Sequence, residues 1–308
     1  MSRTPRRLAL LDAIAESDRD ITELALFKRQ VFFVNESELI RKVLITHALD
    51  FEKSDFQTCL MGRGDGFLHG LGNGLLTSAN AVHKEQHRLI ATLFSQARME
   101  SYAKTMVRIA RDHVRQWVDG STVDLGVEFM GLAVRIIAAT LLSEDFGSQL
   151  PCAVDWLSRI TGGVGRFCRK RSRGGSDPGD IDNALRGLDA LLRGAVEKRK
   201  GQALGGGDLI DVLLRAQAET STPSAAGYVV SDQQIMDDVM TMFITGSENP
   251  RNVLSWTMYL LGEYPEVYEQ ARRAVLQQPS NAHLARAPFC VPTVLHILQE
   301  ALRLYPPG

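Results

Sequence analysis

The chain has 308 residues, of which 44% are hydrophobic and 23% are charged, and its formal net charge is −1. This composition is typical of a globular protein with one large or two ordinary domains, and it excludes disorder over the whole chain. The balanced charge gives no indication of nucleic acid or an acidic membrane surface as a partner. There is no run of 18 apolar residues, and no secretory core follows the basic residues 1–7. We therefore expect a cytoplasmic protein without a membrane span.

The cysteine pattern favours reduced thiols. The four cysteines are widely spaced and form no C-x-x-C pair, which is typical of a cytosolic chain and not of a disulfide framework. They are Cys59, Cys152, Cys168 and Cys290.

The first half of the chain predicts one strand and then helices. Residues 29–34 form a β-branched and aromatic run, which predicts a strand, and the glycine-rich residues 62–80 predict a loop. Gly162 and Gly163 should break a helix, beginning the least structured stretch of the chain. Apolar residues at helical spacing predict earlier helices, which cover residues 82–95, 101–118 and 123–142.

The second half of the chain contains the longest predicted helix, over residues 231–262. Ser231 and Gln234 match a capping box at its start, and about thirty residues would span roughly 45 Å. A helix of this length with apolar residues on several faces should run through the middle of the domain. Shorter helices are predicted around it, over residues 181–199 and 208–218 and after Pro265 and Pro292. The predicted fold class is mainly α.

The centre of the long helix, residues 245–250, reads Thr-Gly-Ser-Glu-Asn-Pro. Pro250 lacks a backbone donor and clashes with the carbonyl four residues earlier, at Gly246. A bend or a widened turn is therefore expected over these residues. On its own, the hexapeptide is also compatible with a buried helix that uses a glycine for close packing and a proline for a bend.

Two histidines, His83 and His87, lie four residues apart on the predicted helix 82–95, and Arg88 follows the second of them. This spacing suits a metal pair, but a zinc-protease helix needs glutamate directly after the first histidine, where this chain has Lys84. No third ligand is evident, so no metal site is predicted. The simplest alternative is two exposed histidines on an amphipathic helix.

The third motif lies on the last predicted helix, residues 292–305. Glu300 and Arg303 leave the same helix face, and Leu-Tyr-Pro-Pro follows them, with Pro306 and Pro307 ending the helix. Without further context this is an ordinary ion pair on a helix surface, which stabilises a protein very little.

Taken together and in this order, the three motifs resemble the signature segments of the cytochrome P-450 family, the haem-thiolate monooxygenases, in their soluble bacterial form. The resemblance implies that Gly246 and Glu248 belong to an oxygen-binding segment of the form A-G-x-E-T-T. Asn249 then occupies the position of an alcohol that relays protons. An amide can position a water molecule but cannot relay a proton as a hydroxyl does.

The same resemblance assigns roles to the other motifs. His83 and His87 occupy the two positions that hold a haem propionate in the family, the second of which is normally arginine, and Arg88 lies one step around the helix. Glu300 and Arg303 correspond to a structural ion pair. The family further implies a mainly helical fold with a small β-sheet, a b-type haem held by a cysteine thiolate, and oxygen insertion into a small organic substrate. A ferredoxin- or flavodoxin-type protein would donate the electrons.

None of the four cysteines lies in a loop like the family's ligand loop, F-x-x-G-x-x-x-C-x-G, which in the family lies downstream of E-x-x-R. We therefore expect residues 1–308 to form a single haem-monooxygenase domain that is incomplete at its C-terminus and inactive as it stands. The alternative is a haem-free remnant that acts, if at all, as a binding or interaction module. The departures from the family pattern at His87, Asn249 and Pro250 favour this alternative.

Overall fold

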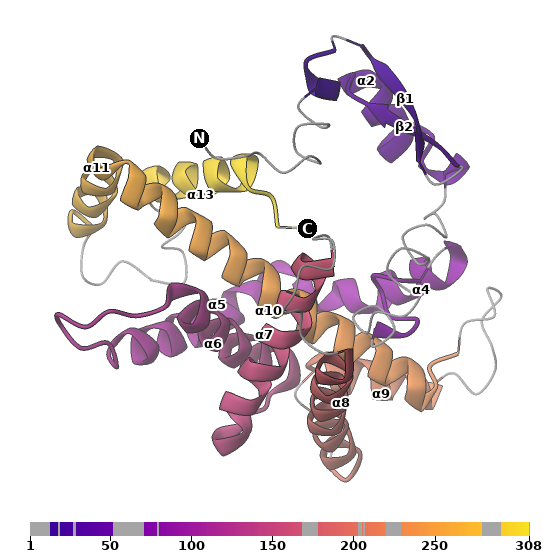
Figure 1. The fold of residues 1–308 in the computed structure, drawn as a ribbon. Coiled ribbons are helices and arrows are strands. Elements are labelled where there is room, and N and C mark those ends of the chain that lie inside the picture. Colours follow the sequence, from indigo (N-terminus) through magenta and orange to yellow (C-terminus); the bar gives the residue numbers. More distant parts are fainter. Residues whose placement is uncertain are drawn as a thin grey trace. The chain divides into compact units, whose positions relative to one another are not determined.

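The structure is a computed structural model, and contacts within it divide the chain into two compact units, Met1–Asp55 and Phe56–Gly308. Most of the described residues are helical, and a two-stranded sheet accompanies them (Figure 1). The mainly helical fold class with a small sheet is therefore confirmed. The structure describes residues 13–17, 19–26, 29–51, 71–78, 80–167, 178–202, 205, 207–219, 229–278 and 291–307.

The first unit is built on a β-hairpin of β1 (Ile21–Leu26) and β2 (Arg29–Val34). The two strands are antiparallel, with Ile21 opposite Val34 at one end and Leu26 opposite Arg29 at the other. β2 is the predicted strand. β1 was not predicted, because alanine and glutamate within it disfavour strands and its pairing with β2 decides its structure.

A short helical segment follows the hairpin. In α2 (Ser37–Arg41) the Glu36 carboxylate accepts a hydrogen bond from the Leu39 amide at 2.7 Å, which caps the helix start. The π-helical turn η1 (Lys42–Thr46) and the 3-10 turn η2 (Ala48–Asp50) complete the described part of this unit.

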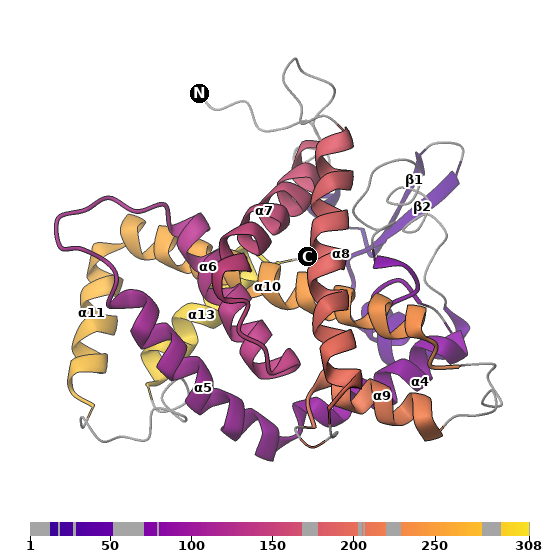
Figure 2. The same ribbon diagram turned by 90° about the horizontal axis from the view of Figure 1, so that it is seen from below.

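The long helix of the second unit is α10 (Asp232–Glu263), whose 32 residues span about 48 Å. It runs through the middle of this unit, as predicted (Figures 1 and 2). The Ser231 hydroxyl caps it by accepting from the Gln234 amide at 3.1 Å. The other half of the predicted capping box is not formed, because the Gln234 side chain donates to the Asn73 carbonyl and to Asp238.

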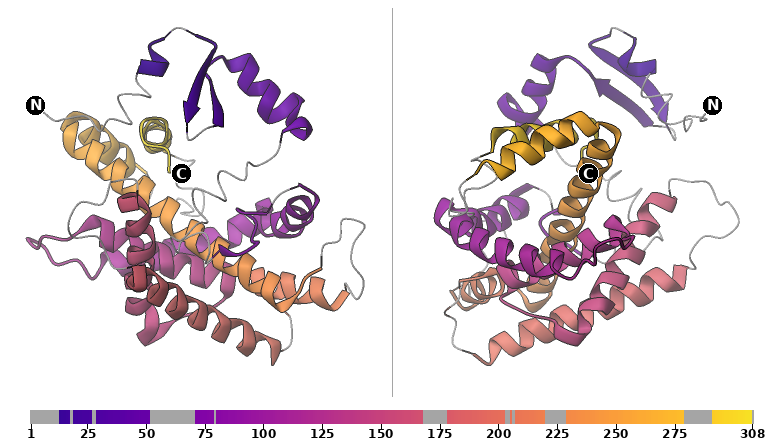
Figure 3. Two further views of the ribbon diagram at one scale, coloured as in Figure 1. Left: turned by 45° about the vertical axis from the view of Figure 1, so that its right-hand side comes forward. Right: turned by 90° about the vertical axis from the view of Figure 1, so that its left-hand side faces the viewer.

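The other helices of this unit surround α10, and α6 packs against it most extensively. α11 and α13 lie at its C-terminal end (Figure 3). The elements are α4 (Asn80–Ile90), η4 (Ala91–Phe94), α5 (Gln96–Val114), α6 (Leu125–Ile137), η5 (Ala138–Leu142), η6 (Gly147–Gln149), α7 (Leu150–Phe167), α8 (Pro178–Lys200), α9 (Leu209–Glu219), α11 (Pro265–Leu276) and α13 (Pro292–Leu304).

Helix boundaries were predicted at two prolines and at a pair of glycines. Pro265 and Pro292 are first-turn prolines, as predicted. The break predicted at Gly162 and Gly163 is wrong, because α7 continues to Phe167. Two glycines cost a helix about 2 kcal/mol relative to alanine, and the packing of α7 on α8 and α6 offsets this cost.

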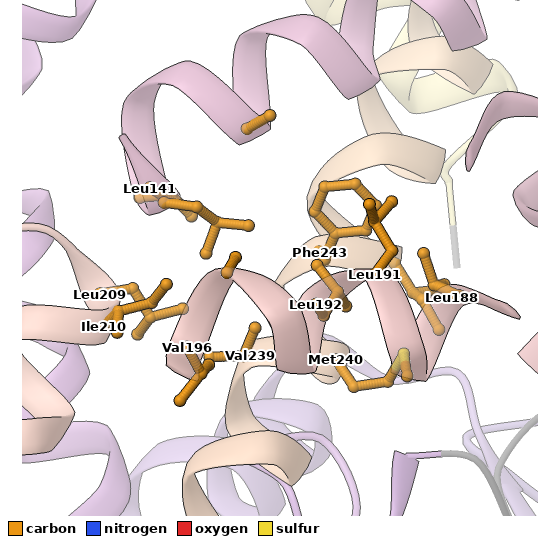
Figure 4. Close-up of a cluster of buried hydrophobic side chains, with 14 of the residues drawn as sticks. Leu141, Leu188, Leu191, Leu192, Val196, Leu209, Ile210, Val239, Met240 and Phe243 are labelled. Carbon is orange, nitrogen blue, oxygen red and sulfur yellow. The ribbon is translucent and has the colours of Figure 1, made fainter. Parts of the chain in front are cut away.

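The main hydrophobic core lies where α8, α9, η5 and α10 meet (Figure 4). Phe243 is the largest fully buried side chain among the described residues, and its ring meets that of Phe146 edge-on with centroids 5.7 Å apart. Aromatic and leucine side chains of this size supply most of the free energy of burial. The side chains labelled in the figure are Leu141, Leu188, Leu191, Leu192, Val196, Leu209, Ile210, Val239, Met240 and Phe243.

One helical stretch among the described residues, Leu125–Leu142, is long and apolar enough to cross a membrane by length and composition alone. It comprises α6 and η5, which pack against α5, α7, α9 and α10. A core helix passes the same test, so the finding is weak support for a membrane span.

Candidate functional site

The predicted oxygen-side residues lie at the middle of α10. A Cβ atom added to Gly246 would come within 2.5 Å of the Ile137 Cδ1 atom on α6. The glycine therefore lets α10 approach α6 closely, which is the packing role that the sequence analysis left open.

Glu248 is half-buried on α10, and burial raises the pKa of its carboxyl above the usual range. The positive charge of Arg251 and a hydrogen bond with Asn252 partly oppose this shift. The Arg251 guanidinium also donates to the Asn252 side-chain oxygen at 2.9 Å. Asn249 is exposed beside this group. Burial thus favours the protonated form of Glu248, whereas its polar neighbours Arg251 and Asn252 favour the ionised form.

Pro250 is exposed within α10, which is α-helical on both sides of it. The widened turn offered by the sequence analysis is therefore wrong. A bend of the helix axis at this point stays a prediction, based on the missing backbone donor and on the proline ring.

Helix α4 brings the two predicted propionate-side histidines together. His83 is half-buried and His87 is exposed, with their ring centroids 6.0 Å apart. Arg88 is exposed and its guanidinium pairs with the Glu85 carboxylate at 3.0 Å. The histidines therefore share one side of α4, and Arg88 is engaged with a neighbour on the same helix.

The loop Leu71–Ser78 lies against α10, a contact that was not predicted from the sequence. The Asn73 amide donates to Asp237 at 2.8 Å, and the Leu75 amide donates to Asp238 at 3.1 Å. Gly72 has a positive φ of 52° and no room for a Cβ atom beside the Asp237 carboxylate. No signal short of the fold itself could have found these contacts, because they join residues more than 160 positions apart.

The predicted ion pair on α13 is formed. The Arg303 guanidinium binds the exposed Glu300 carboxylate through two hydrogen bonds, of 2.8 and 2.6 Å, and the bond from Arg303 lowers the pKa of Glu300. Just beyond, the Tyr305 ring stacks on Trp256 with centroids 3.9 Å apart and planes 3° apart. This stack attaches the end of α13 to α10, and it could not be predicted from the sequence pattern.

One cysteine lies among the described residues. Cys152, near the start of α7, is a free and exposed thiol. Cys59, Cys168 and Cys290 lie outside the described residues.

Comparisons with known proteins support the family that the three motifs indicate. The family model named Cytochrome P450 matches residues 7–308. Cyclooctatin synthase from Streptomyces melanosporofaciens is 29% identical over 308 residues, which cover 94% of this chain and 62% of that protein. Pentalenene oxygenase from Streptomyces avermitilis is 28% identical over 246 residues, which cover 77% of this chain and 53% of that protein.

Solved structures share the fold. A zebrafish cytochrome P450 with progesterone gives a TM-score of 0.77 at 19% identity, covering 99% of this chain and 72% of that one. A cyanobacterial cytochrome P450 with bound retinoic acid gives a TM-score of 0.71 at 21% identity, covering 94% and 62%. The fold is therefore that of the P450 haem proteins.

The family model spans nearly the whole sequence, and the chain belongs to the cytochrome P450 family. It spans 62% of the length of cyclooctatin synthase and also 62% of the length of cyclooctat-9-en-7-ol 5-monooxygenase from the same organism.

Family membership implies a haem cofactor, and the described residues fit it in part. His83, half-buried on α4, can donate a hydrogen bond to a propionate, and Glu248, half-buried on α10, can hold a proton on the oxygen side. The family's axial ligand is a cysteine thiolate. Cys152 is exposed on a helix surface, which does not suit a ligand that needs a buried, preorganised loop.

Proposed function

We propose that this chain supplies the propionate-binding and oxygen-side parts of a haem-thiolate monooxygenase. The observation that supports this most is the half-buried Glu248, whose pKa is raised, at the position that matches the family's acid. When haem is bound with its thiolate ligand, it activates dioxygen for insertion into a substrate. Burial favours the protonated form of the Glu248 carboxyl, and Asn249 can orient a water molecule beside it.

The proposed substrate is a small organic molecule of the terpene kind, as the names of relatives such as pentalenene oxygenase suggest. The proposed electron donor is a ferredoxin- or flavodoxin-type protein, and the proposed location is the cytoplasm. We further propose that the 308 residues carry out no monooxygenation by themselves, because none of their cysteines lies in a glycine-framed haem loop.

The role of α4 can be tested by titrating the chain with hemin and following the absorption of the bound haem. Replacement of His83 by alanine should weaken haem binding about tenfold, because a hydrogen bond to a charged propionate contributes roughly 1.5 kcal/mol or more. His296→Ala removes an exposed histidine of α13 and should leave the affinity unchanged. Equal affinities for the wild-type chain and His83→Ala would contradict the propionate-binding role.

The second candidate is a haem-free binding or interaction module. The contact between Gly246 and Ile137 favours it, because it gives the glycine a packing role that needs no cofactor. Exposed Asn249 in place of an alcohol also favours it. The hemin titration separates the candidates, because a haem-free module should bind no haem in a defined stoichiometry.

A further inference from the structure

The loop Leu71–Ser78 is held on α10 by a buried polar network that the proposed reaction does not use. Asp238 is fully buried, and its carboxylate accepts from the Leu75 amide at 3.1 Å and from Gln86 at 3.2 Å. Gln234 donates to the same carboxylate at 3.3 Å. Gln86 and Gln234 also both donate to the Asn73 carbonyl, at 2.8 and 3.0 Å. Three segments, the loop, α4 and α10, therefore meet at one carboxyl group.

This network joins the two helices that carry the predicted site residues. Gln86 is fully buried on α4, three residues after His83 and one before His87. Asp238 lies ten residues before Glu248 on α10. Any change in the bonds between Gln86 and Asp238 must therefore alter how α4 sits on α10.

The charge close to Asp238 is negative and disfavours its ionised form. The charge that faces it is that of its neighbour Asp237, which is also buried and accepts from Gln233 and from the Asn73 amide. The loop presents backbone groups and Asn73, and α4 presents the neutral Gln86. Helices α8 and α9 contribute apolar side chains to the adjoining core. Among the described residues, no cation forms an ion pair with either aspartate.

The network is also incompletely bonded. The Gln86 side-chain oxygen and the Thr241 hydroxyl are both buried, and neither has a hydrogen-bond partner among the described residues. Partly satisfied buried networks stabilise a structure less than complete ones. A carboxyl group that is fully buried without a counter-ion is costly to ionise, so its ionisation favours a state in which it reaches water.

We propose that Asp238 is a positioning residue, which seats the loop Leu71–Ser78 and helix α4 on α10 when it is protonated and releases them when it ionises. Burial raises the pKa of Asp238 to about 7, with the charge of Asp237 adding to the effect and the hydrogen bonds opposing it. The attachment of this loop and of α4 to α10 is therefore strongest in mildly acid solution and weakens toward neutral pH. The inference rests on the proposed function only in taking α4 as the cofactor helix.

The direction of the pH dependence follows from proton binding. In the open state Asp238 has an ordinary pKa near 3.9, whereas in the seated state its pKa is about 7. Between these values the seated state binds one proton more than the open state, so seating weakens about tenfold per pH unit as pH rises. Above about pH 7.5 both states are ionised and the dependence levels off.

Amide hydrogen exchange of the full chain tests this directly. Protection factors for the loop amides of Asn73 and Leu75 and for α4, corrected for the intrinsic rate at each pH, should fall about tenfold per unit from about pH 5 to 7. Asp238→Asn should abolish this slope. Asp232→Asn makes the same charge change at an exposed position on the same helix and should keep it.

If Asp238→Asn fails to fold, the variant Asp237→Asn provides a second test of the proposal. Asp237→Asn leaves Asp238 in place but removes the neighbouring charge, so the protection should level off at a lower pH. Wild-type protection without a slope over this range, or a slope that persists in Asp238→Asn, would overturn the proposal. Absence of haem binding in the hemin titration would contradict the proposed function alone, because exchange is measured without haem.

Discussion

Gly74 lies where the seated loop touches α10, and it has no room for a side chain. A Cβ atom there would collide with the Thr241 hydroxyl and lie 2.5 Å from the Asp237 carbonyl, which belongs to the helix backbone and cannot move aside. The glycine is thus required by packing, at a φ that other residues can adopt.

The first prediction compares two glycine-to-alanine changes of opposite sign. Gly74→Ala should lower the free energy of unfolding by about 1–3 kcal/mol, as overpacking does. Gly194→Ala, on the open side of α8 with nothing within 4 Å, should raise it by about 0.5–1 kcal/mol through helix propensity. Urea unfolding followed by circular dichroism measures both. Equal effects of the two changes would mean that the loop is not seated as described.

At the scale of elements, the junction of α8, α9 and η5 depends on a buried arginine. The Arg199 guanidinium binds Asp208 at 2.7 Å and Asp211 at 2.9 Å, and it donates to the Leu142 carbonyl at 3.2 Å. Asp211 also accepts from the Gly207 amide at 2.8 Å. One cation thus joins the end of α8, the start of α9 and the end of η5.

The second prediction follows from the burial of both aspartates. Arg199→Met should lower the free energy of unfolding by about 3–5 kcal/mol, because it leaves two buried carboxylates without a counter-charge. Its neighbour Lys198 is exposed and pairs with the mostly buried Glu144 carboxylate at 2.9 Å, so Lys198→Met removes a solvent-exposed cation from a single carboxylate and should cost clearly less than Arg199→Met. Thermal unfolding of the two variants provides the comparison, and similar losses would show that the buried group is not the main support of this junction.

The elements also show what can be predicted from the sequence. α10 was predictable because Ser231 caps it and its apolar pattern has helical spacing. β1 and the continuation of α7 through Gly162 and Gly163 were not, because both depend on packing partners that local propensity does not contain. The motif residues were predicted through their resemblance to family segments, whereas the contacts of Asp237 and Asp238 with the loop arise only from the fold.

At the scale of the whole molecule, belonging to the cytochrome P450 family explains the order of the three motifs and the central position of α10. The described residues place a half-buried histidine on α4 and a half-buried acid on α10, which are the two protein groups proposed to meet the cofactor. The third requirement is the family's cysteine ligand loop, and none of the four cysteines in the sequence stands in its F-x-x-G-x-x-x-C-x-G pattern.

The spectrum of the reconstituted chain with carbon monoxide tests this account most directly. The purified chain is mixed with hemin, reduced and exposed to the gas, and its difference spectrum is compared with that of a complete P450 treated alike. We predict no band of the thiolate-ligated type. Any bound haem should show a histidine-type spectrum, and its intensity should fall in His83→Ala because that variant binds haem more weakly. A thiolate-type band would contradict the account, and serine variants of Cys59, Cys152, Cys168 and Cys290 would then identify the ligand.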